Sequence, residues 1–323
     1  MGIHPTKGLS AMPNTGEPEA PPPLGGEADP NHWHFRSLGE DGPLPNPVGH
    51  TFPLLTHDVD GRWSVVGTGF CGDGLFLTAR HVVEHAFDAD RQLSPLVILH
   101  LYSRGGFGAT DMLLRPIMQC WLGDAADIAL GVAATVTNND TGKLLQHWRW
   151  PLSWAAPPIG SPAATYAFPR HALSEDGAKI SFHPDLFPGS ILGSGDFRDR
   201  TMVPHPFLEF DCRVHGAASG GPLVVADRVV GTNSTELDKN IDHPPGPAYG
   251  AQIRCLGSAY IEDAALLGED GTRRLTFDEL VRAGCVDVAN YVGRDNEALS
   301  GRIVRPDLPV NAPHPEVRVA QYF

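Results

Sequence analysis

Short apolar runs separated by turn residues form the main pattern of the chain from Thr51 onward. In Trp63–Phe70 glycines recur within an apolar run, which is typical of a strand that another segment approaches closely. The Gly72-Asp73-Gly74 sequence is a hairpin turn signal, and the returning strand is predicted over Leu75–Ala79. His81–His85 then predicts a short helical turn. Three further strands are predicted in this half of the chain: Leu96–Tyr102, Leu113–Leu122 and Ile128–Val136.

A second β-rich half follows the proline-rich segment Pro151–Pro162. Repeated short strands with turn residues between them favour barrels or sandwiches over a parallel sheet. The predicted class is therefore all-β. The strands expected in this half are Ala163–Phe168, Phe207–Val214, Leu223–Val225, Val229–Asn233 and Ala248–Arg254.

The two ends of the chain differ from this pattern. Residues 1–50 are dense in proline and glycine, bury too little apolar surface to offset their ordering entropy, and are predicted to be disordered. Near the other end a helix is predicted over Leu275–Ala283, because Thr276 can cap it, Glu279 lies three residues later and Gly284 can end it. Residues from about 292 are expected to be irregular.

Composition narrows the classes of partner. The net charge of -14 argues against nucleic acid and anionic membranes, and no apolar run approaches the roughly 20 residues that cross a bilayer. The N-terminus lacks a secretory signal, so a cytoplasmic location is expected. The five cysteines are widely spaced, without a Cys-x-x-Cys pair, which favours reduced thiols over a zinc site. No metal or other cofactor is predicted.

The segment His215–Pro222 carries the strongest chemical signal. Ser219 stands before two glycines on a tight turn, where backbone N–H groups can converge on an oxyanion. A serine nucleophile needs a base and the base needs an orienting group. His81 follows a predicted strand and is the candidate base. The orienting carboxylate is predicted to be Asp127, which opens an apolar strand, with Asp124 in the preceding turn as the weaker choice.

These motifs together resemble the trypsin-like serine proteases, which have the chymotrypsin fold. The resemblance covers roughly residues 52–262 and has the chain order His, Asp, Ser. It rests on Gly67–Phe70, Leu77–Val83, Asp127–Leu130 and Ser219–Pro222. It implies that Ser219 is the nucleophile, His81 the general base and acid, and Asp127 the group that orients His81.

The resemblance also implies two perpendicular six-stranded antiparallel β-barrels with the site in the cleft between them. The expected organisation has four parts: a disordered segment (1–50), a first barrel with His81 and Asp127 (51–150), a second barrel with Ser219 (151–262), and a C-terminal helix with an irregular extension (263–323).

The chain departs from the family in the turn before the nucleophile. The oxyanion hole is predicted at Ala217, Ala218 and Ser219, with the N–H groups of Ala217 and Ser219 as donors, yet the family usually has glycine where Ala217 stands. That difference leaves two possibilities open. Either the oxyanion hole forms only after substrate binds, or the catalytic site is weak or inactive. Trypsin has an aspartate at the position of Ala218, so activation by a freed N-terminus is not expected. In this respect the chain resembles bacterial and HtrA-like relatives.

Substrate specificity is predicted to come from Arg213 and His215, and from the strand residues Thr232, Asn233 and Ser234. Arg213 pairs with an acidic substrate side chain if it points into the pocket; the favoured alternative is a solvated strand residue. His215 is either a pocket donor or a turn residue.

The function expected is a serine endopeptidase that acts on a polypeptide substrate and is restrained by a regulatory protein partner or a tail of the chain. One alternative is a catalytically weak peptide-binding or scaffold module with the same fold. A second is a zinc peptidase, since His81–His85 also satisfies the H-x-x-E-H pattern.

Overall fold

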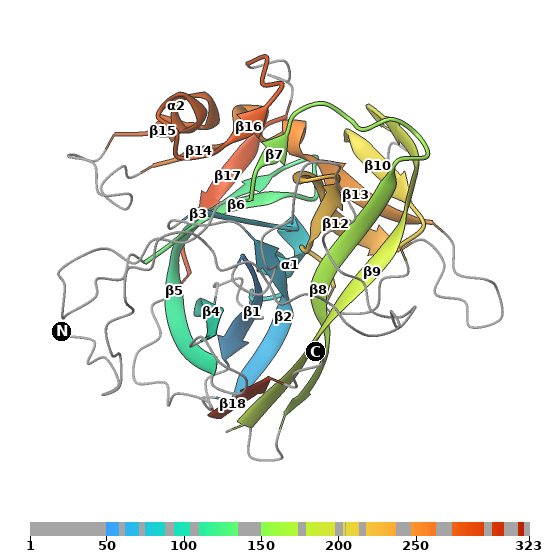
Figure 1. The fold of residues 1–323 in the computed structure, drawn as a ribbon. Coiled ribbons are helices and arrows are strands. Elements are labelled where there is room, and N and C mark those ends of the chain that lie inside the picture. Colours follow the sequence, from blue (N-terminus) through green and yellow to red (C-terminus); the bar gives the residue numbers. More distant parts are fainter. Residues whose placement is uncertain are drawn as a thin grey trace, which may run out of the picture.

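The structure is a computed structural model that describes residues 50–57, 62–70, 75–87, 94–103, 110–134, 150–173, 179–197, 203, 205–212, 218–236, 247–262, 273–293, 299–306 and 316–319. Apart from His50, the N-terminal segment predicted to be disordered lies outside the described residues. Figure 1 shows a molecule built mainly of strands, with α2 at its periphery.

The first barrel is closed by antiparallel pairing of six strands. Their order around the barrel is β5-β4-β1-β2-β3-β6, and β6 pairs back to β5. Every residue of β3 and β6 is buried, which explains why both segments are continuous apolar runs in the sequence. The strands are β1 (Thr51–His57), β2 (Trp63–Phe70), β3 (Leu75–Thr78), β4 (Leu96–Ser103), β5 (Thr110–Gly123) and β6 (Ala129–Ala133).

A second set of six antiparallel strands closes in the same way. Its order is β11-β8-β9-β10-β13-β12, with β12 pairing back to β11. The predicted all-β class with two six-stranded barrels is therefore confirmed, and the fold is chymotrypsin-like. The strands are β8 (Pro162–Leu173), β9 (Lys179–Gly195), β10 (Phe207–Phe210), β11 (Pro222–Val225), β12 (Arg228–Glu236) and β13 (Ala248–Gln252).

The remaining elements are short. β7 (Leu152–Ser153) pairs in parallel with β12 and with β16 (Val288–Ala289), while β14 (Tyr260–Ile261) pairs with β15 (Leu275–Thr276). The helices are α1 (Arg80–Glu84), the 3-10 helix η3 (Ile253–Ser258) and α2 (Phe277–Arg282). Over the described ranges, no helix has the length and apolar character required to cross a bilayer.

The predicted C-terminal helix is confirmed with its capping box. Thr276 accepts a hydrogen bond from the Glu279 N–H through its hydroxyl, and the Glu279 carboxylate accepts from the Thr276 N–H at 2.7 Å. Gly284 follows the helix with a φ of 71°, a conformation that glycine adopts without steric cost.

The C-terminal extension contains strands, so the expectation of irregular structure from residue 292 was wrong for two segments. β17 (Gly301–Val304) pairs antiparallel with β5 and adds a seventh strand beside the first barrel, and β18 (Glu316–Val319) pairs in parallel with β9. Figure 1 shows them at opposite ends of the molecule. Both are only 4 residues long. Such short segments acquire a strand conformation from the edge that they join and carry little periodicity of their own.

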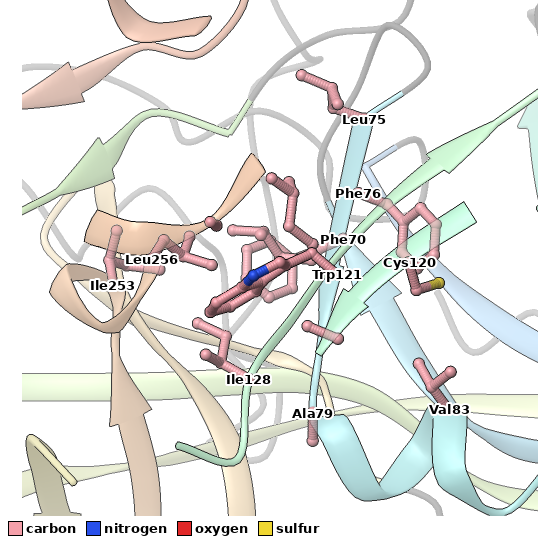
Figure 2. Packing of buried hydrophobic residues seen from close by; sticks show 14 of the residues in the cluster. Phe70, Leu75, Phe76, Ala79, Val83, Cys120, Trp121, Ile128, Ile253 and Leu256 are labelled. Atoms are coloured by element: carbon pink, nitrogen blue, oxygen red, sulfur yellow. The ribbon is translucent and has the colours of Figure 1, made fainter. Parts of the chain in front are cut away.

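The largest hydrophobic core cluster continues from the first barrel into the second. Trp121 on β5 is fully buried and lies among Phe70, Ile128 and Leu256, the last of which belongs to η3 (Figure 2). The same cluster contains Phe277 of α2, whose ring stacks on Trp154 with centroids 5.9 Å apart. The C-terminal helix is therefore part of the main core.

Replacing the core side chain of this helix should destabilise the whole protein. Phe277→Ala removes a fully buried ring and is expected to lower the free energy of unfolding by roughly 3–5 kcal/mol. Urea unfolding measures the change. Arg282→Ala is the control, because that side chain is 75% exposed on the same helix and its loss should cost about 0.5 kcal/mol or less. Equal, small effects of both changes would contradict the core role of α2.

Candidate active site

The antiparallel pairing of β3 with β6 brings His81 and Asp127 together. Thr78 at the end of β3 lies opposite Ala129 at the start of β6. His81 follows Thr78 by three residues as the second residue of α1, and Asp127 precedes Ala129 by two residues in the turn after β5. Both side chains therefore project from the same end of this strand pair.

Asp127 holds His81 by two hydrogen bonds. The His81 ring lies with Nδ1 2.7 Å from Asp127 Oδ2, and the His81 backbone N–H donates to Oδ1 at 3.0 Å. An ionised carboxylate only accepts, so Nδ1 carries the ring proton and Nε2 is left as an acceptor. The Ser234 hydroxyl donates a further hydrogen bond to Asp127 Oδ2.

These contacts determine the charge state of the carboxyl group. Burial by itself raises the pKa of Asp127, but the hydrogen bonds from His81, the positive charge of the His81 ring when it is protonated, and the Ser234 hydrogen bond lower it to about 2. Asp127 is thus an anion at neutral pH, as an orienting group for a histidine must be.

Backbone geometry explains the glycine after the candidate nucleophile. Gly220 has a φ of 84°, and a Cβ there would lie 2.1 Å from Thr78 Oγ1 and 2.2 Å from the Thr68 carbonyl oxygen. Thr78 Oγ1 in turn donates to that carbonyl at 2.7 Å. The turn formed by Ser219 and Gly220, called the nucleophile turn below, is therefore in direct contact with β2 and β3 of the first barrel. Only glycine fits at position 220.

One hydrogen bond ties Ser219 to the barrel that carries its candidate base. The Thr68 N–H donates to the Ser219 carbonyl oxygen at 2.9 Å. A Cβ at Gly67 would lie 3.0 Å from the same carbonyl and 2.6 Å from a Val82 methyl carbon on α1. The close approach predicted from the glycines of β2 is confirmed: Gly67 leaves space for both the turn and α1.

The Ser219 hydroxyl forms its hydrogen bond with the Ser234 carbonyl oxygen at 3.4 Å, and in the described part of the chain no hydrogen bond joins it to His81. Ser234 consequently contacts two of the three candidate catalytic side chains, Asp127 through its hydroxyl and Ser219 through its carbonyl oxygen. Sequence reasoning assigned Ser234 to substrate binding and missed the contact with Asp127. Only its position in the strand after the nucleophile pointed to the site.

The other predicted site residues divide into two groups. Ala218, Thr232 and Asn233 are buried, and the Asn233 side chain donates to the Ala218 carbonyl oxygen at 3.0 Å, so it supports the nucleophile turn. Their role in the oxyanion hole or in substrate binding stays a prediction. The residues Arg213, His215 and Ala217 lie outside the described part of the chain.

The zinc pattern finds little support in the local structure. α1 is only 5 residues long, His81 Nδ1 is engaged by Asp127, and Glu84 pairs with Arg80 at 3.5 Å and with Arg302 at 3.1 Å. His85 is exposed, with its ring centroid 5.5 Å from that of His81. Where the chain is described, no group of three or more potential metal ligands occurs.

The known proteins that resemble this chain are only distantly similar to it. No protein-family model matches the chain, and no curated protein matches it. The solved structures that match include Deg5, with 14% identity, a TM-score of 0.44 and coverage of 64% of this chain and 84% of that chain. The MamO protease domain from Magnetospirillum magneticum has 17% identity, a TM-score of 0.41 and coverage of 63% and 92%. The HtrA-type protease AlgW with a decapeptide has 15% identity, a TM-score of 0.43 and coverage of 64% and 62%. At values this low, the closed pairing of the two barrels, and not the likeness, establishes the fold.

The lowered pKa of Asp127 makes a prediction about acid stability. Its pKa of about 2 lies below the value of about 3.9 in an unfolded chain, so its contribution is present above pH 4 and is lost as the pH falls toward 2. Between about pH 5 and pH 3 the wild type should lose roughly 1 kcal/mol more unfolding free energy than Asp127→Asn. Urea unfolding of both proteins at the two pH values measures this difference. Identical pH dependence would show that Asp127 is not a stabilised anion.

Proposed function

We propose that the protein is a serine endopeptidase that hydrolyses peptide bonds through Ser219, His81 and Asp127. The observation that carries the proposal is the His81–Asp127 pair, with the nucleophile turn hydrogen-bonded to the same barrel. A largely buried carboxylate that fixes the tautomer of a partly exposed histidine, beside a serine on a tight glycine turn, is the arrangement that acyl transfer requires.

The chemistry follows from these parts. The Ser219 hydroxyl turns from the Ser234 carbonyl toward His81 Nε2, gives up its proton there and attacks the peptide carbonyl carbon. The negative charge that develops on the carbonyl oxygen is stabilised by the backbone N–H groups of Ser219 and Ala217. His81 then protonates the leaving amine, and water releases the acyl group from Ser219 by the reverse sequence.

In the resting arrangement the Ser219 hydroxyl must exchange one hydrogen bond for another. Its bond to the Ser234 carbonyl is long, at 3.4 Å, so little free energy opposes the rotation. Hydrogen bonds of catalytic groups are often long without substrate and shorten in the complex. The same feature favours the second candidate function, a peptide-binding module in which this serine stays turned away.

A fluorophosphonate probe separates the two functions. An activated Ser219 should be labelled in the wild type, labelling should vanish in Ser219→Ala, and a metal chelator should leave it unchanged. Asp127→Asn should reduce the labelling rate and peptide turnover by roughly 10⁴-fold, because His81 then adopts the wrong tautomer. Arg282→Ala is a control for handling, because that exposed side chain on α2 pairs with Asp278 and not with the three catalytic groups.

The outcomes narrow the candidate functions. Absence of labelling in the wild type, with normal folding, would leave either a latent peptidase held by its tail or partner or the binding module. Peptide cleavage that occurs without labelling of Ser219 and stops on addition of the chelator would favour the zinc peptidase. Near-normal turnover of Asp127→Asn would show that another carboxylate orients His81.

We also propose that the N-terminal tail or a protein partner keeps the Ala217 turn unproductive until a signal arrives. The structure refines how the tail should be removed. His50 is buried, with its ring 6.0 Å from that of Trp150, and Thr51 begins β1. Deletion of residues 1–49 therefore leaves the described fold complete. Faster labelling of Ser219 in the shortened chain is expected, whereas an unchanged rate would exclude the tail and leave a separate partner as the restraint.

A further inference from the structure

The strand β17 is attached to the segment that carries Asp127. β17 pairs with the end of β5, and Gly301 lies opposite Gly123. One residue further toward Asp127, the Asp124 N–H donates to the Ser300 carbonyl oxygen at 2.8 Å. A Cβ at Gly301 would lie 2.2 Å from a ring carbon of Trp121, so the strand fits this edge at very close range.

Side chains extend this attachment into a closed ring of four residues. Arg302 contacts the Asp124 carboxylate at 3.4 Å and the Glu84 carboxylate at 3.1 Å. Glu84 also pairs with Arg80 at 3.5 Å, and Arg80 donates to the Asp124 carbonyl oxygen at 2.6 Å. The Ser300 hydroxyl adds a hydrogen bond of 2.8 Å to the Asp124 carboxylate.

Three of the four members of the ring lie close in sequence to a catalytic group. Arg80 immediately precedes His81 and Glu84 follows it by three residues on α1, while Asp124 precedes Asp127 by three residues in the same turn. Arg302 is the only member that comes from neither of these segments. It therefore joins the helix that carries the base to the turn that carries the orienting carboxylate.

Neither segment fixes its own position. α1 has 5 residues, and its N-cap residue Ala79 forms no side-chain cap, whereas isolated helices need about 12–15 residues to be even marginally stable. The residues from Asp124 to Asp127 form a bend without regular structure. The relative placement of His81 and Asp127 must therefore come from tertiary contacts, and the ring provides them on the side where β17 lies.

We propose that Arg302, with Ser300, is a positioning residue for the His81–Asp127 pair. The proposal deepens the proposed function, on which it rests, because the pair matters for turnover only if the protein is a peptidase. Arg302 does not touch the substrate in this scheme. It acts by holding α1 and the Asp127 turn in register.

The test compares three variants of the whole chain: a double variant, a matched control and a conservative substitution. The double variant Ser300→Ala, Arg302→Met removes the side-chain contacts to Asp124 and Glu84 and leaves the backbone pairing of β17. Arg302 is 52% exposed, so the variant should fold normally. Arg305→Met is the control, since that arginine lies just after the same strand and pairs with Glu262 at 2.5 Å. Arg302→Lys keeps the positive charge and should therefore retain part of the wild-type kcat and of the wild-type His81 tautomer.

Two measurements follow from the mechanism. The kcat for a peptide substrate should fall by roughly tenfold or more in the double variant with little change in KM, because a small misplacement of catalytic groups slows chemistry and not binding. The ¹⁵N NMR shifts of the neutral His81 ring report its tautomer directly. They should indicate protonation at Nδ1 in the wild type and Arg305→Met, and a mixture of tautomers in the double variant. Asp127→Asn provides the reference for a pair that has lost its orienting group.

The outcomes distinguish this proposal from the proposed function. A double variant that matches Arg305→Met in the His81 tautomer overturns the positioning role, whatever its activity. If neither the folded wild type nor the chain without residues 1–49 cleaves peptides or reacts with the fluorophosphonate probe, the peptidase is overturned, while the tautomer measurement still decides whether Arg302 positions the pair. A tautomer mixture in the double variant together with a reduced kcat supports both.

Discussion

The negative charge of Asp127 is the constraint on which the arrangement of the site depends. Its side chain is only 16% exposed, and a charge removed from water is costly unless hydrogen bonds replace the lost solvation. The replacements come from the His81 ring, the His81 backbone and the Ser234 hydroxyl. Two barrels must therefore meet at this point, since His81 belongs to the first and Ser234 to the second. The hydrogen bonds that the Asp127 carboxylate requires therefore hold His81 close to β12, the strand beside the nucleophile turn.

The packing between the barrels makes that meeting point specific. The Thr68 N–H reaches the Ser219 carbonyl oxygen, and Gly220 has no Cβ where one would collide with the first barrel. A Cβ at Gly67 would collide with Val82 and lie only 3.0 Å from the Ser219 carbonyl oxygen. The surrounding core is shared, since residues of both barrels belong to the cluster around Trp121. The position of Ser219 relative to His81 is thus determined by close backbone contact between the barrels, which a common core supports.

Particular residues show how much of this could be predicted from sequence. The strands with clear apolar runs, such as Trp63–Phe70, coincide with observed strands, and the capping box at Thr276 predicted α2. His81 and Asp127 were recognisable because His81 follows one such apolar run and Asp127 precedes another. β9 was not, since prolines and glycines interrupt its pattern and its 17 residues are held by pairing with β8, β10 and β18. The contact of Ser234 with Asp127 spans 107 residues and depends on the docking of the barrels, which no local pattern reports.

The pairing of β17 also bears on the order in which the molecule is assembled. Gly301 pairs with Gly123, which lies 178 positions earlier in the chain. Contacts between such distant segments form late, because the entropy of closing the loop must be overcome first, and during synthesis the N-terminal part emerges before its partner exists. Both barrels can therefore pair their own strands while the edge next to Asp127 is still uncovered. β17, from the C-terminal part of the chain, then completes the surroundings of a site whose principal residues were all synthesised earlier.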